Sequence, residues 1–550
     1  MKMKTRVIII LLIFNHFYLF SQDTKINLQK VNVVDNYTPK ISISRKISDT
    51  PTINDTTKNI KKINYSFIEK NFNIFKKIDT ISFAKIKKEP ITKLYSKYLK
   101  IGLGNTSLPL IEGIYSSTRN KNWVYSARYA FQNSKSKTKD YDASFRNNIF
   151  HVDAKRIFSF GYIKGNISRE SNVFSSHGSN SNLSESQRRQ YWAYSNLNLT
   201  FENFDKKNID YISSFKFSDL NENKENQFIF NTVFKKKFSL YNYSFLVEAD
   251  INKHKINNST LINDQNIFKL KPLMSGYFYG LKCDFGIKQY SIIKQNSDSK
   301  FNVFPYFKIK QILIPETFNV QFVIDGDINK NTYSSLSRIN PFIVNTHSYD
   351  GVNLNLQNTI TKYRLNFFLE TKLLSDLSLI FTSNFSNKLN NPFFVLDKTT
   401  SYQNKFSILY DDINQFTFKT QLEWSPSDYS GLELTSIYHH YTSSYLSNVY
   451  DLPSFEFLID GYYNLGNKFI GRINLFAEFH RIGIQKNSEN NLLEEVILDN
   501  IIDFNLNFEY KYNSVLSAYL EGKRLIGGYE YWLNYPVVSP EIFLGISYKF

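Results

Sequence analysis

The sequence predicts an all-β protein: a transmembrane antiparallel β-barrel of about 22 strands that follows a mostly irregular amino-terminal tail. Three observations lead to this fold class. They are an alternating carboxyl-terminal strand, repeated blocks of period-two alternation from Tyr98 onward, and an export signal at the amino terminus. Phe, Trp and Tyr make up 17% of the chain, in agreement with the aromatic girdles that such barrels carry.

The last ten residues have the pattern of a strand with one side in lipid. Side chains alternate between the two faces of a strand, and here one face is apolar and ends in two aromatic rings. That face consists of Ile542, Leu544, Ile546, Tyr548 and Phe550. The other face is mostly small or polar. This arrangement favours the final strand of a membrane barrel over the last strand of a soluble sheet.

The amino terminus has the layout of a secretory signal peptide, which we place at residues 1–21. Basic residues within the first six positions precede the apolar run 7–14, and Ser21 supplies a small residue at the cleavage site. A membrane anchor would need about 20 apolar residues, but Asn15 and His16 interrupt this run. No cysteine lies near the cleavage site, so a lipid anchor there is not expected. No long apolar segment follows, which leaves a closed barrel as the membrane-spanning alternative.

Residues 22–97 read as a basic periplasmic tail, extended or partly disordered. Between residues 23 and 98, sixteen lysines and arginines stand against seven acidic residues. The segment has too few apolar side chains to offset the entropy of ordering it, although its isolated Ile and Phe residues could dock on another surface. The whole chain has a net charge of +18. No recognition helix, zinc-ligand spacing or RNA-binding motif accompanies this charge, so we predict no nucleic-acid partner.

Residues 98–550 read as the barrel, because apolar and polar residues alternate in blocks of about ten. Charged residues on the inner faces of several blocks would be costly in a packed core, whereas a hydrated lumen accommodates them. The predicted lumen-facing polar residues are Lys419, Glu423, Arg472, Glu478, His480, Asp503 and Glu509.

The connections between these blocks alternate between short and long. Short ones are predicted near 119–121, 375–376 and 513–514, and longer polar ones near 175–190, 329–348, 387–403 and 485–493. Short periplasmic turns and long outer loops are the expected asymmetry of an outer-membrane barrel, which also needs an even number of strands. The blocks number roughly twenty, and we predict 22 strands.

Three carboxyl-terminal stretches, 503–512, 529–536 and 544–550, resemble the last strands of TonB-dependent receptors. Together with 34–39 and 93–105, they are most similar to a group of Bacteroidota barrels that lack a full plug domain. The resemblance implies an outer-membrane location and contact with lipid and lipopolysaccharide. It also implies that the outer-membrane assembly machinery reads Tyr548 and Phe550 as an assembly signal. It implies no substrate.

The chain departs from those receptors in the segment before the first strand. About 58 residues separate Pro39 from Tyr98, without glycine-rich hairpins, so a full plug is not expected. Residues 30–34 resemble a TonB box, which would pair with a periplasmic energy-coupling protein by strand addition. A chance β-branched run in the tail is the alternative.

The sequence predicts neither an enzyme nor a cofactor or metal site. His439 and His440 are adjacent and would point to opposite faces of a strand. Asp411–Asp412 and Glu494–Glu495 are expected to be solvated carboxylates in loops, and no nucleophile, zinc or phosphate motif is present. The single cysteine, Cys283, cannot form an internal disulfide.

Three functions follow, and an outer-membrane hydrolase is the weakest of them. The leading hypothesis is solute uptake or passage by a TonB-dependent-receptor-like or porin-like barrel. The alternative is a non-transporting structural or scaffolding subunit of an outer-membrane complex. In either case residues 22–97 would plug the pore or recruit a periplasmic partner.

Overall fold

The computed structural model describes residues 65–66, 93–135, 144–175, 188–204, 209–220, 225–254, 264–294, 298–344, 356–399, 403–537 and 540–550. The predicted signal peptide and nearly all of the predicted tail lie outside these ranges. The chain divides into two compact units, residues 1–88 and 89–550, and the second contains the barrel. Within the described ranges, no helix has the length and apolar character needed to cross a membrane.

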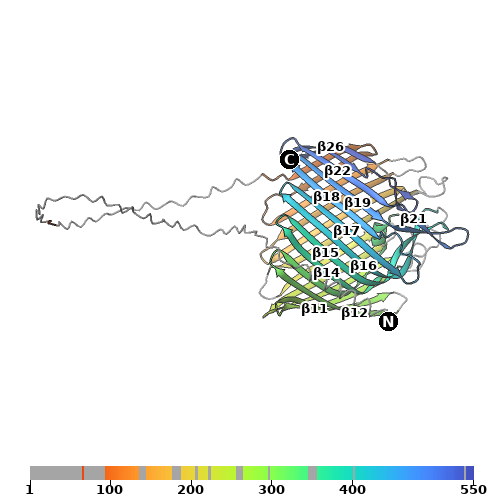
Figure 1. Cartoon of the computed structure of the whole chain (residues 1–550), viewed down its shortest axis with the longest axis horizontal. Helices are drawn as coiled ribbons and strands as arrows, with labels where there is room; N and C mark the ends of the chain where they lie inside the picture. Colours follow the sequence, from red (N-terminus) through yellow and green to blue (C-terminus); the bar gives the residue numbers. More distant parts are fainter. Residues whose placement is uncertain are drawn as a thin grey trace, which may run out of the picture. The chain divides into compact units, whose positions relative to one another are not determined.

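Twenty-two antiparallel strands close into a barrel, which confirms the predicted fold class and strand number. Figure 1 shows the strands running obliquely across the wall, the tilt that barrel closure requires. The first eleven are β1 (Lys97–Gly104), β2 (Ser107–Ser116), β3 (Trp123–Ser134), β4 (Phe145–Ile157), β5 (Gly161–Ser175), β6 (Arg189–Asn203), β7 (Asp210–Leu220), β8 (Glu225–Phe238), β9 (Tyr241–His254), β10 (Gln265–Phe278) and β11 (Leu281–Lys294). The second eleven are β12 (Lys300–Ile314), β13 (Phe318–Asn329), β14 (Thr359–Leu374), β15 (Leu377–Asp397), β16 (Lys405–Ser427), β17 (Ser430–Ser443), β18 (Phe455–Leu465), β19 (Phe469–Phe479), β22 (Ile501–Lys511), β23 (Leu516–Lys523) and β26 (Glu541–Lys549).

Within the part of the chain that the structure describes, four short strands and one helix lie outside the barrel wall. They are α3 (Tyr333–Ile339), the ribbon of β20 (Arg481–Lys486) and β21 (Leu493–Leu498), and the small pair β24 (Glu530–Trp532) and β25 (Tyr535–Pro536). All of them belong to connections at one end of the barrel, which we call the loop end. At the other end, the turn end, connections such as 239–240, 279–280, 375–376 and 428–429 are short. The first barrel strand, β1, begins at the turn end, and the last, β26, ends there.

The barrel closes between its first and last strands. β1 pairs with β26 from Tyr98 opposite Lys549 to Gly104 opposite Phe543. The backbones of Lys97 and Phe550 exchange two further hydrogen bonds, of 2.9 and 3.0 Å. On β26, Leu544 and Ile546 are 65% and 55% exposed on the outward face. Phe543, which directly precedes Leu544, is fully buried. The alternation predicted for this strand is therefore present.

Two glycines face each other at this seam. Gly102 of β1 is the register partner of Gly545 of β26, and Tyr519 of β23 is the partner of Gly545 on its other side. A Cβ atom at either glycine would overlap the Tyr519 hydroxyl. The phenol ring therefore lies against both glycines on the inner face, with Lys100 Nζ 4.1 Å from the ring centroid.

Three predicted loop assignments are wrong. The loop predicted at 387–403 is mostly strand, because β15 continues to Asp397 after a bulge between Lys388 and Asn391. Asn390 takes a φ of 53° there, a conformation that asparagine tolerates, so pairing resumes at Asn391. The pair Asp411–Asp412 lies in β16, and Glu494–Glu495 lies in β21.

Candidate functional site: the capped mouth and the lumen

A buried apolar cluster, which we call the cap, spans the loop end of the barrel. Fifteen buried residues form it: Trp192, Tyr194, Leu220, Tyr333, Leu336, Ile343, Val344, Leu356, Phe394, Leu396, Phe406, Leu498, Trp532, Leu533 and Tyr535. They come from β6 and β7 on one part of the wall, from β15 and β16 far around it, and from the α3, β21 and β24–β25 segments between. Residues on separated parts of the wall therefore meet in one core across the mouth.

Specific contacts join the parts of the cap. The ring of Phe342, next to α3, stacks on Tyr535 with centroids 3.8 Å apart, and Phe394 of β15 packs edge-on against Trp532 at 5.2 Å. Trp192 of β6 donates to the carbonyl of Pro341 at 2.8 Å. The Lys405 ammonium of β16 donates to the Gln190 side chain of β6. This last bond directly connects two strands that lie far apart around the barrel.

Charged groups fasten α3 to the wall. The Glu225 carboxylate accepts hydrogen bonds from the backbone N–H groups of Tyr333 and Ser334, at 3.0 and 2.7 Å. Before the helix, Lys330 pairs with Asp250 at 2.8 Å. These contacts add to the capping box that Thr332 and Ser335 form at the helix start.

The other end of α3 is also held to the wall. Arg338 pairs with Glu170 of β5 at 2.8 Å, and its guanidinium lies 3.9 Å from the centroid of the Tyr194 ring. The α3 segment is therefore bound to β5 and β6 on one side and to β8 and β9 on the other.

Arg481 holds the β24–β25 segment in place through hydrogen bonds and also forms an ion pair. Its side chain is 2% exposed and donates to the carbonyls of Glu530 and Tyr531. Its Nε also lies 3.3 Å from the Glu478 carboxylate. Asp451 lies in the neighbouring loop 444–454. Burial raises the pKa of its carboxyl to about 7, although the positive charge of Arg481 acts to lower it.

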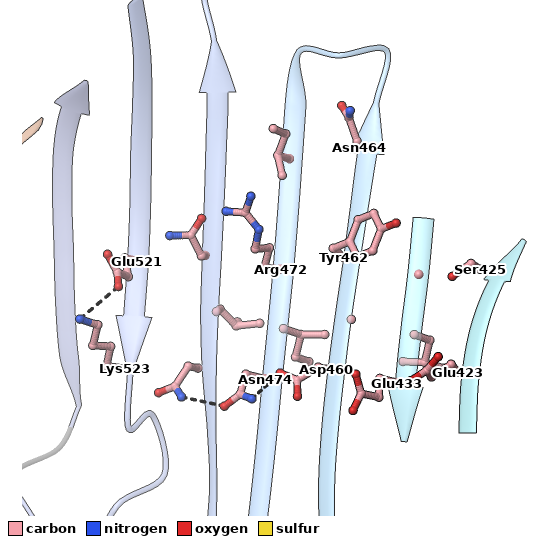
Figure 2. Close-up of a pocket in the computed structure, with 18 of the residues that line it drawn as sticks. Glu423, Ser425, Glu433, Asp460, Tyr462, Asn464, Arg472, Asn474, Glu521 and Lys523 are labelled. Atoms are coloured by element: carbon pink, nitrogen blue, oxygen red, sulfur yellow. Dashed lines mark hydrogen bonds and ion pairs between the residues drawn. The ribbon is translucent and has the colours of Figure 1, made fainter. Parts of the chain in front are cut away.

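Below the cap, the lumen holds an acidic pocket of about 930 Å³ on the inner faces of β16 to β19, β22 and β23 (Figure 2). Glu423, Glu433 and Asp460 are successive register partners on its wall. Like charges directly opposite one another are unfavourable, and Arg472 and Lys523 also line this pocket.

A chain of amides connects this acidic row to the next strands. Asn505 donates to Asn474 at 3.1 Å, and Asn474 donates to Asp460 at 2.5 Å. The pocket can therefore hold water and polar or cationic groups.

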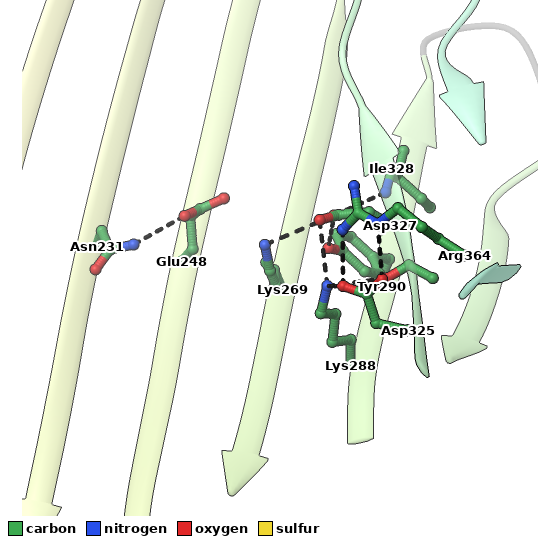
Figure 3. Close-up of polar contacts among 10 residues, drawn as sticks. Asn231, Glu248, Lys269, Lys288, Tyr290, Asp325, Asp327, Ile328 and Arg364 are labelled. Atoms are coloured by element: carbon green, nitrogen blue, oxygen red, sulfur yellow. Dashed lines mark hydrogen bonds and ion pairs between the residues drawn. The ribbon is translucent and has the colours of Figure 1, made fainter. Parts of the chain in front are cut away.

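On the inner faces of β8 to β14, by contrast, cationic and anionic side chains pair with one another and form a polar ladder (Figure 3). Lys288 lies 2.8 Å from Asp325 and 3.2 Å from Asp327. Arg364 binds Asp325 through two nitrogens, at 2.9 and 2.8 Å. Lys269, 3.9 Å from Asp327, extends the ladder toward β8. The ladder ends in the bond from Asn231 to Glu248, at 2.8 Å.

The structure places the predicted lumen residues in different environments. Glu423 and Arg472 line the acidic pocket, whereas Glu478 binds Arg481 beneath the cap. Asp503 is fully buried and accepts from the backbone of Ile526 at 3.0 Å.

Lys419 and Glu509 lie on the inner faces of β16 and β22, outside the pocket lining. His480 follows the last residue of β19 and has a φ of 57°. The alternation that grouped it with Glu478 does not extend to it.

The predicted assembly residues lie at the seam. Tyr548 and Phe550 are 43% and 48% exposed on the outward face, with ring centroids 5.4 Å apart. Lys97 Nζ lies 5.4 Å from the centroid of the Phe550 ring. Within the described ranges, no group of three or more His, Cys, Asp or Glu residues is arranged to hold a metal ion.

Sequence reasoning missed the ladder and the cap. The inner residues of β10, β11 and β13 alternate in the sequence, but a bulge between Asp325 and Asp327 shifts the register and hides the pattern. The α3 and β24–β25 segments carry no strand periodicity. Their meeting at Phe342 and Tyr535 joins residues that lie far apart in the sequence.

Comparison with known proteins finds similarity in structure alone. No protein-family model matches the sequence, and no curated protein does. Among solved structures, the siderophore receptor PirA from Acinetobacter baumannii is 10% identical with a TM-score of 0.64, over 84% of this chain and 81% of that one. The FrpB iron transporter from Neisseria meningitidis (F3-3 variant) is 10% identical with a TM-score of 0.63, over 84% and 82%. The copper transporter OprC is 9% identical with a TM-score of 0.58, over 84% and 81%.

These similarities give the fold. The barrel is similar in fold to those of the siderophore receptor, the iron transporter and the copper transporter.

Proposed function

We propose that this chain is an outer-membrane barrel for uptake or passage of a solute, that it works in the manner of TonB-dependent receptors, and that its cap controls access to the lumen. The observation that carries the proposal is the buried core that spans the loop end and is held to the wall by ion pairs. An open porin would need no such core. The charged inner face supports a hydrated route below the cap, and the fold likeness to metal and siderophore transporters supports uptake.

This proposal fixes the orientation. Residues 1–21 are removed at export, and the mature chain begins near Gln22 in the periplasm. The turn end faces the periplasm, and the cap faces the cell exterior. Residues 22–97 then stand where an energy-coupling protein could bind them, or where they could reach the open end of the lumen. Neither an enzymatic activity nor a cofactor is part of the proposal.

Conductance in planar bilayers tests the role of the cap. The variant Glu170→Gln/Glu225→Gln/Asp250→Asn removes the carboxylates that hold α3, and we expect it to conduct far more than the wild-type chain. The matched control Glu423→Gln/Glu433→Gln/Asp460→Asn removes the same number of carboxylates from the lumen and should leave the cap closed. Heat-modifiability on gels confirms that each barrel is folded. Equal, low conductance of all three folded proteins would contradict a gating cap.

An exposed apolar tip favours the second function, a scaffolding subunit of an outer-membrane complex. Ile497 of β21 and Tyr445 of loop 444–454 are 87% and 86% exposed beyond the barrel wall, and Leu492 is 62% exposed. Exposed apolar groups outside the lipid-facing band are a common feature of partner surfaces. Deletion of residues 22–92 separates the two functions. Raised permeability supports a tail that occludes the lumen, whereas loss of a co-purifying periplasmic protein with unchanged permeability supports the scaffold.

We also propose that Tyr548 and Phe550 form the assembly signal. Removing residues 548–550 should abolish insertion, because the strand would lose both its aromatic end and its last pairs with β1. The double variant Tyr548→Phe/Phe550→Tyr keeps two aromatic rings and should insert normally. Normal insertion of the truncated chain would refute the signal.

A further inference from the structure

The acidic pocket holds negative and positive groups at two different levels of the barrel wall. Glu423, Glu433 and Asp460 form the acidic level, as successive register partners on β16, β17 and β18. Tyr462 of β18 and Arg472 of β19, also register partners, form the next level toward the turn end. Figure 2 shows these two side chains together on their own level. Two residues along an antiparallel strand separate the levels by about 7 Å.

The protein neutralises neither of these levels. Among the described residues, no cation lies within ion-pair distance of Glu423, Glu433 or Asp460, and no carboxylate lies within that distance of Arg472. Asn474 donates to the Asp460 carboxylate at 2.5 Å and holds it at its own level. Unpaired groups of opposite charge therefore lie within the length of one small ligand.

An apolar surface lies beside the Arg472 guanidinium. Tyr462 is 44% exposed, although alternation with Asp460 turns it into the lumen and away from lipid. Its ring leans over Gly431, where a Cβ atom would come within 2.5 Å of it. Ile470 also lines the pocket. Apolar groups exposed to water are stabilised by contact with an apolar part of a ligand, so this surface favours a solute with an apolar segment.

We propose that the pocket binds a zwitterionic solute whose ammonium and carboxylate groups stand at the two ends of an apolar chain. The ammonium donates to the acidic level, where neighbouring carboxylates repel one another in the absence of a cation. The carboxylate accepts hydrogen bonds from the Arg472 guanidinium, and the chain lies against Tyr462. The inference deepens the proposed function, on which it rests for the identification of the ligand as the transported solute.

The pocket disfavours solutes that carry one charge alone. A simple cation would satisfy the acidic level and leave Arg472 without a partner. A simple anion would bind Arg472 but be repelled by the three carboxylates nearby. A zwitterion with adjacent charges would be too short to reach both levels. The separation of the two charges should therefore decide which solutes bind.

Isothermal titration calorimetry of the whole mature protein in detergent tests the proposal. The probe is 6-aminohexanoate, whose charges stand at the ends of an apolar chain of suitable length, and we expect saturable binding. Hexylamine, hexanoate and glycine should each bind at least about fivefold more weakly, because each satisfies one level only. Low ionic strength is used because salt screens such contacts. Equal binding of hexylamine and 6-aminohexanoate would overturn the zwitterion site.

A matched pair of variants tests the location of the site. Asp460→Asn/Arg472→Gln removes one carboxylate and one guanidinium from the pocket and should weaken binding of 6-aminohexanoate by at least about 20-fold. The control Glu112→Gln/Arg128→Gln removes the same two groups from an ion pair of 2.7 Å on the inner faces of β2 and β3, outside the pocket lining. It should bind as the wild type does. Equal binding by both folded variants would refute the site.

Arg472→Glu adds a readout that a merely structural role would not move. This variant presents carboxylates at both levels and should prefer 1,6-diaminohexane to 6-aminohexanoate, which reverses the wild-type order. An unreversed order in a folded variant would contradict the role of Arg472. Failure of the proposed function has a different outcome. If this binding order holds but Glu170→Gln/Glu225→Gln/Asp250→Asn conducts no more than the wild type, the gating cap is refuted and the zwitterion site stands.

Discussion

The cap and the acidic pocket lie on the same inner surface but differ in how far their side chains are buried and in whether their charged groups are paired. In the cap, Trp192 and Phe406 are fully buried, and charged groups such as Arg481 and Glu225 each have partners. In the acidic pocket, Glu423, Glu433 and Asp460 stand opposite one another, and Tyr462 is 44% exposed. The mouth of this barrel is therefore packed like a protein interior, whereas the wall beneath it is hydrated. Substitutions should therefore have large effects in the first region and small ones in the second.

The largest effect is expected at the centre of the cap. Trp532→Ala should lower the free energy of unfolding by about 3–5 kcal/mol, because a 7%-exposed ring that packs against Phe394 and Phe406 leaves a cavity. Tyr462→Ala in the acidic pocket should cost less than about 1 kcal/mol. Urea unfolding from lipid vesicles measures both. Similar losses at the two sites would remove the distinction between the cap and the wall.

The lipid face gives the next effect. Leu506→Arg should destabilise the barrel by about 2–4 kcal/mol if it lies near the bilayer midplane. Asn507→Arg, on the lumen side of the same strand, should cost much less. Asn505→Arg should fall between them, because the Asn505 amide donates to Asn474 and its oxygen accepts from the Arg524 backbone at 2.9 Å. Unfolding from vesicles with all three variants tests this order.

The polar ladder should be more sensitive than the acidic row. Asp325→Asn should cost about 2–3 kcal/mol, since it leaves Arg364 without its carboxylate and Lys288 with Asp327 alone. Glu433→Gln should change stability little or raise it by a few tenths of a kcal/mol, because it relieves repulsion from two neighbouring carboxylates. A loss at Glu433 as large as that at Asp325 would mean that the acidic row is internally paired.

The last effect depends on pH and concerns Asp451. Its pKa is raised in the folded protein, so folding favours the protonated form. This contribution to stability is present below about pH 4 and is lost as the pH rises through about 7. Amides of loop 444–454 should therefore exchange faster at pH 8 than at pH 5, after correction for intrinsic rates. The difference should correspond to about 1–3 kcal/mol.

Asp451→Asn provides the control for this pH effect. Asparagine suits the φ of 59° at this position, and it has no charge to lose. The pH dependence of exchange in loop 444–454 should therefore disappear in this variant. If it persists, another titrating group governs the loop.

The barrel could be predicted from sequence because its main signal is local. Period-two alternation on β22 and β26 requires no knowledge of what packs against them, so the presence of the strands and their lipid faces followed from the pattern. Counting blocks gave only roughly twenty strands, and the choice of 22 was confirmed by the structure. Places where the backbone breaks the period were misread. The bulge before Asn391 made the end of β15 look like a loop, and the left-handed conformation of His480 ended a pattern that seemed continuous.

The cap could not be predicted because its signal is non-local. Trp532 and Phe394, or Lys405 and Gln190, meet only after the barrel has brought distant strands around one mouth. In the sequence, Phe342 and Tyr535 are ordinary aromatic residues in polar connections. The charged lumen was predictable as a class, since inner positions alternate with apolar ones. Which charges pair and which oppose one another depends on register, and register is not visible in a single strand.

The glycines at the seam have a consequence for the order in which this molecule is made. Tyr519 meets Gly545 as soon as β23 and β26 lie together, but it meets Gly102 only when the first strand arrives beside the last. In the open sheet the Tyr519 ring therefore contacts Gly545 alone, and in the closed barrel it contacts both glycines. The contact with Gly102 forms only when the two ends of the sheet join. A methyl group at Gly102 would leave every earlier strand pairing intact and obstruct that final step.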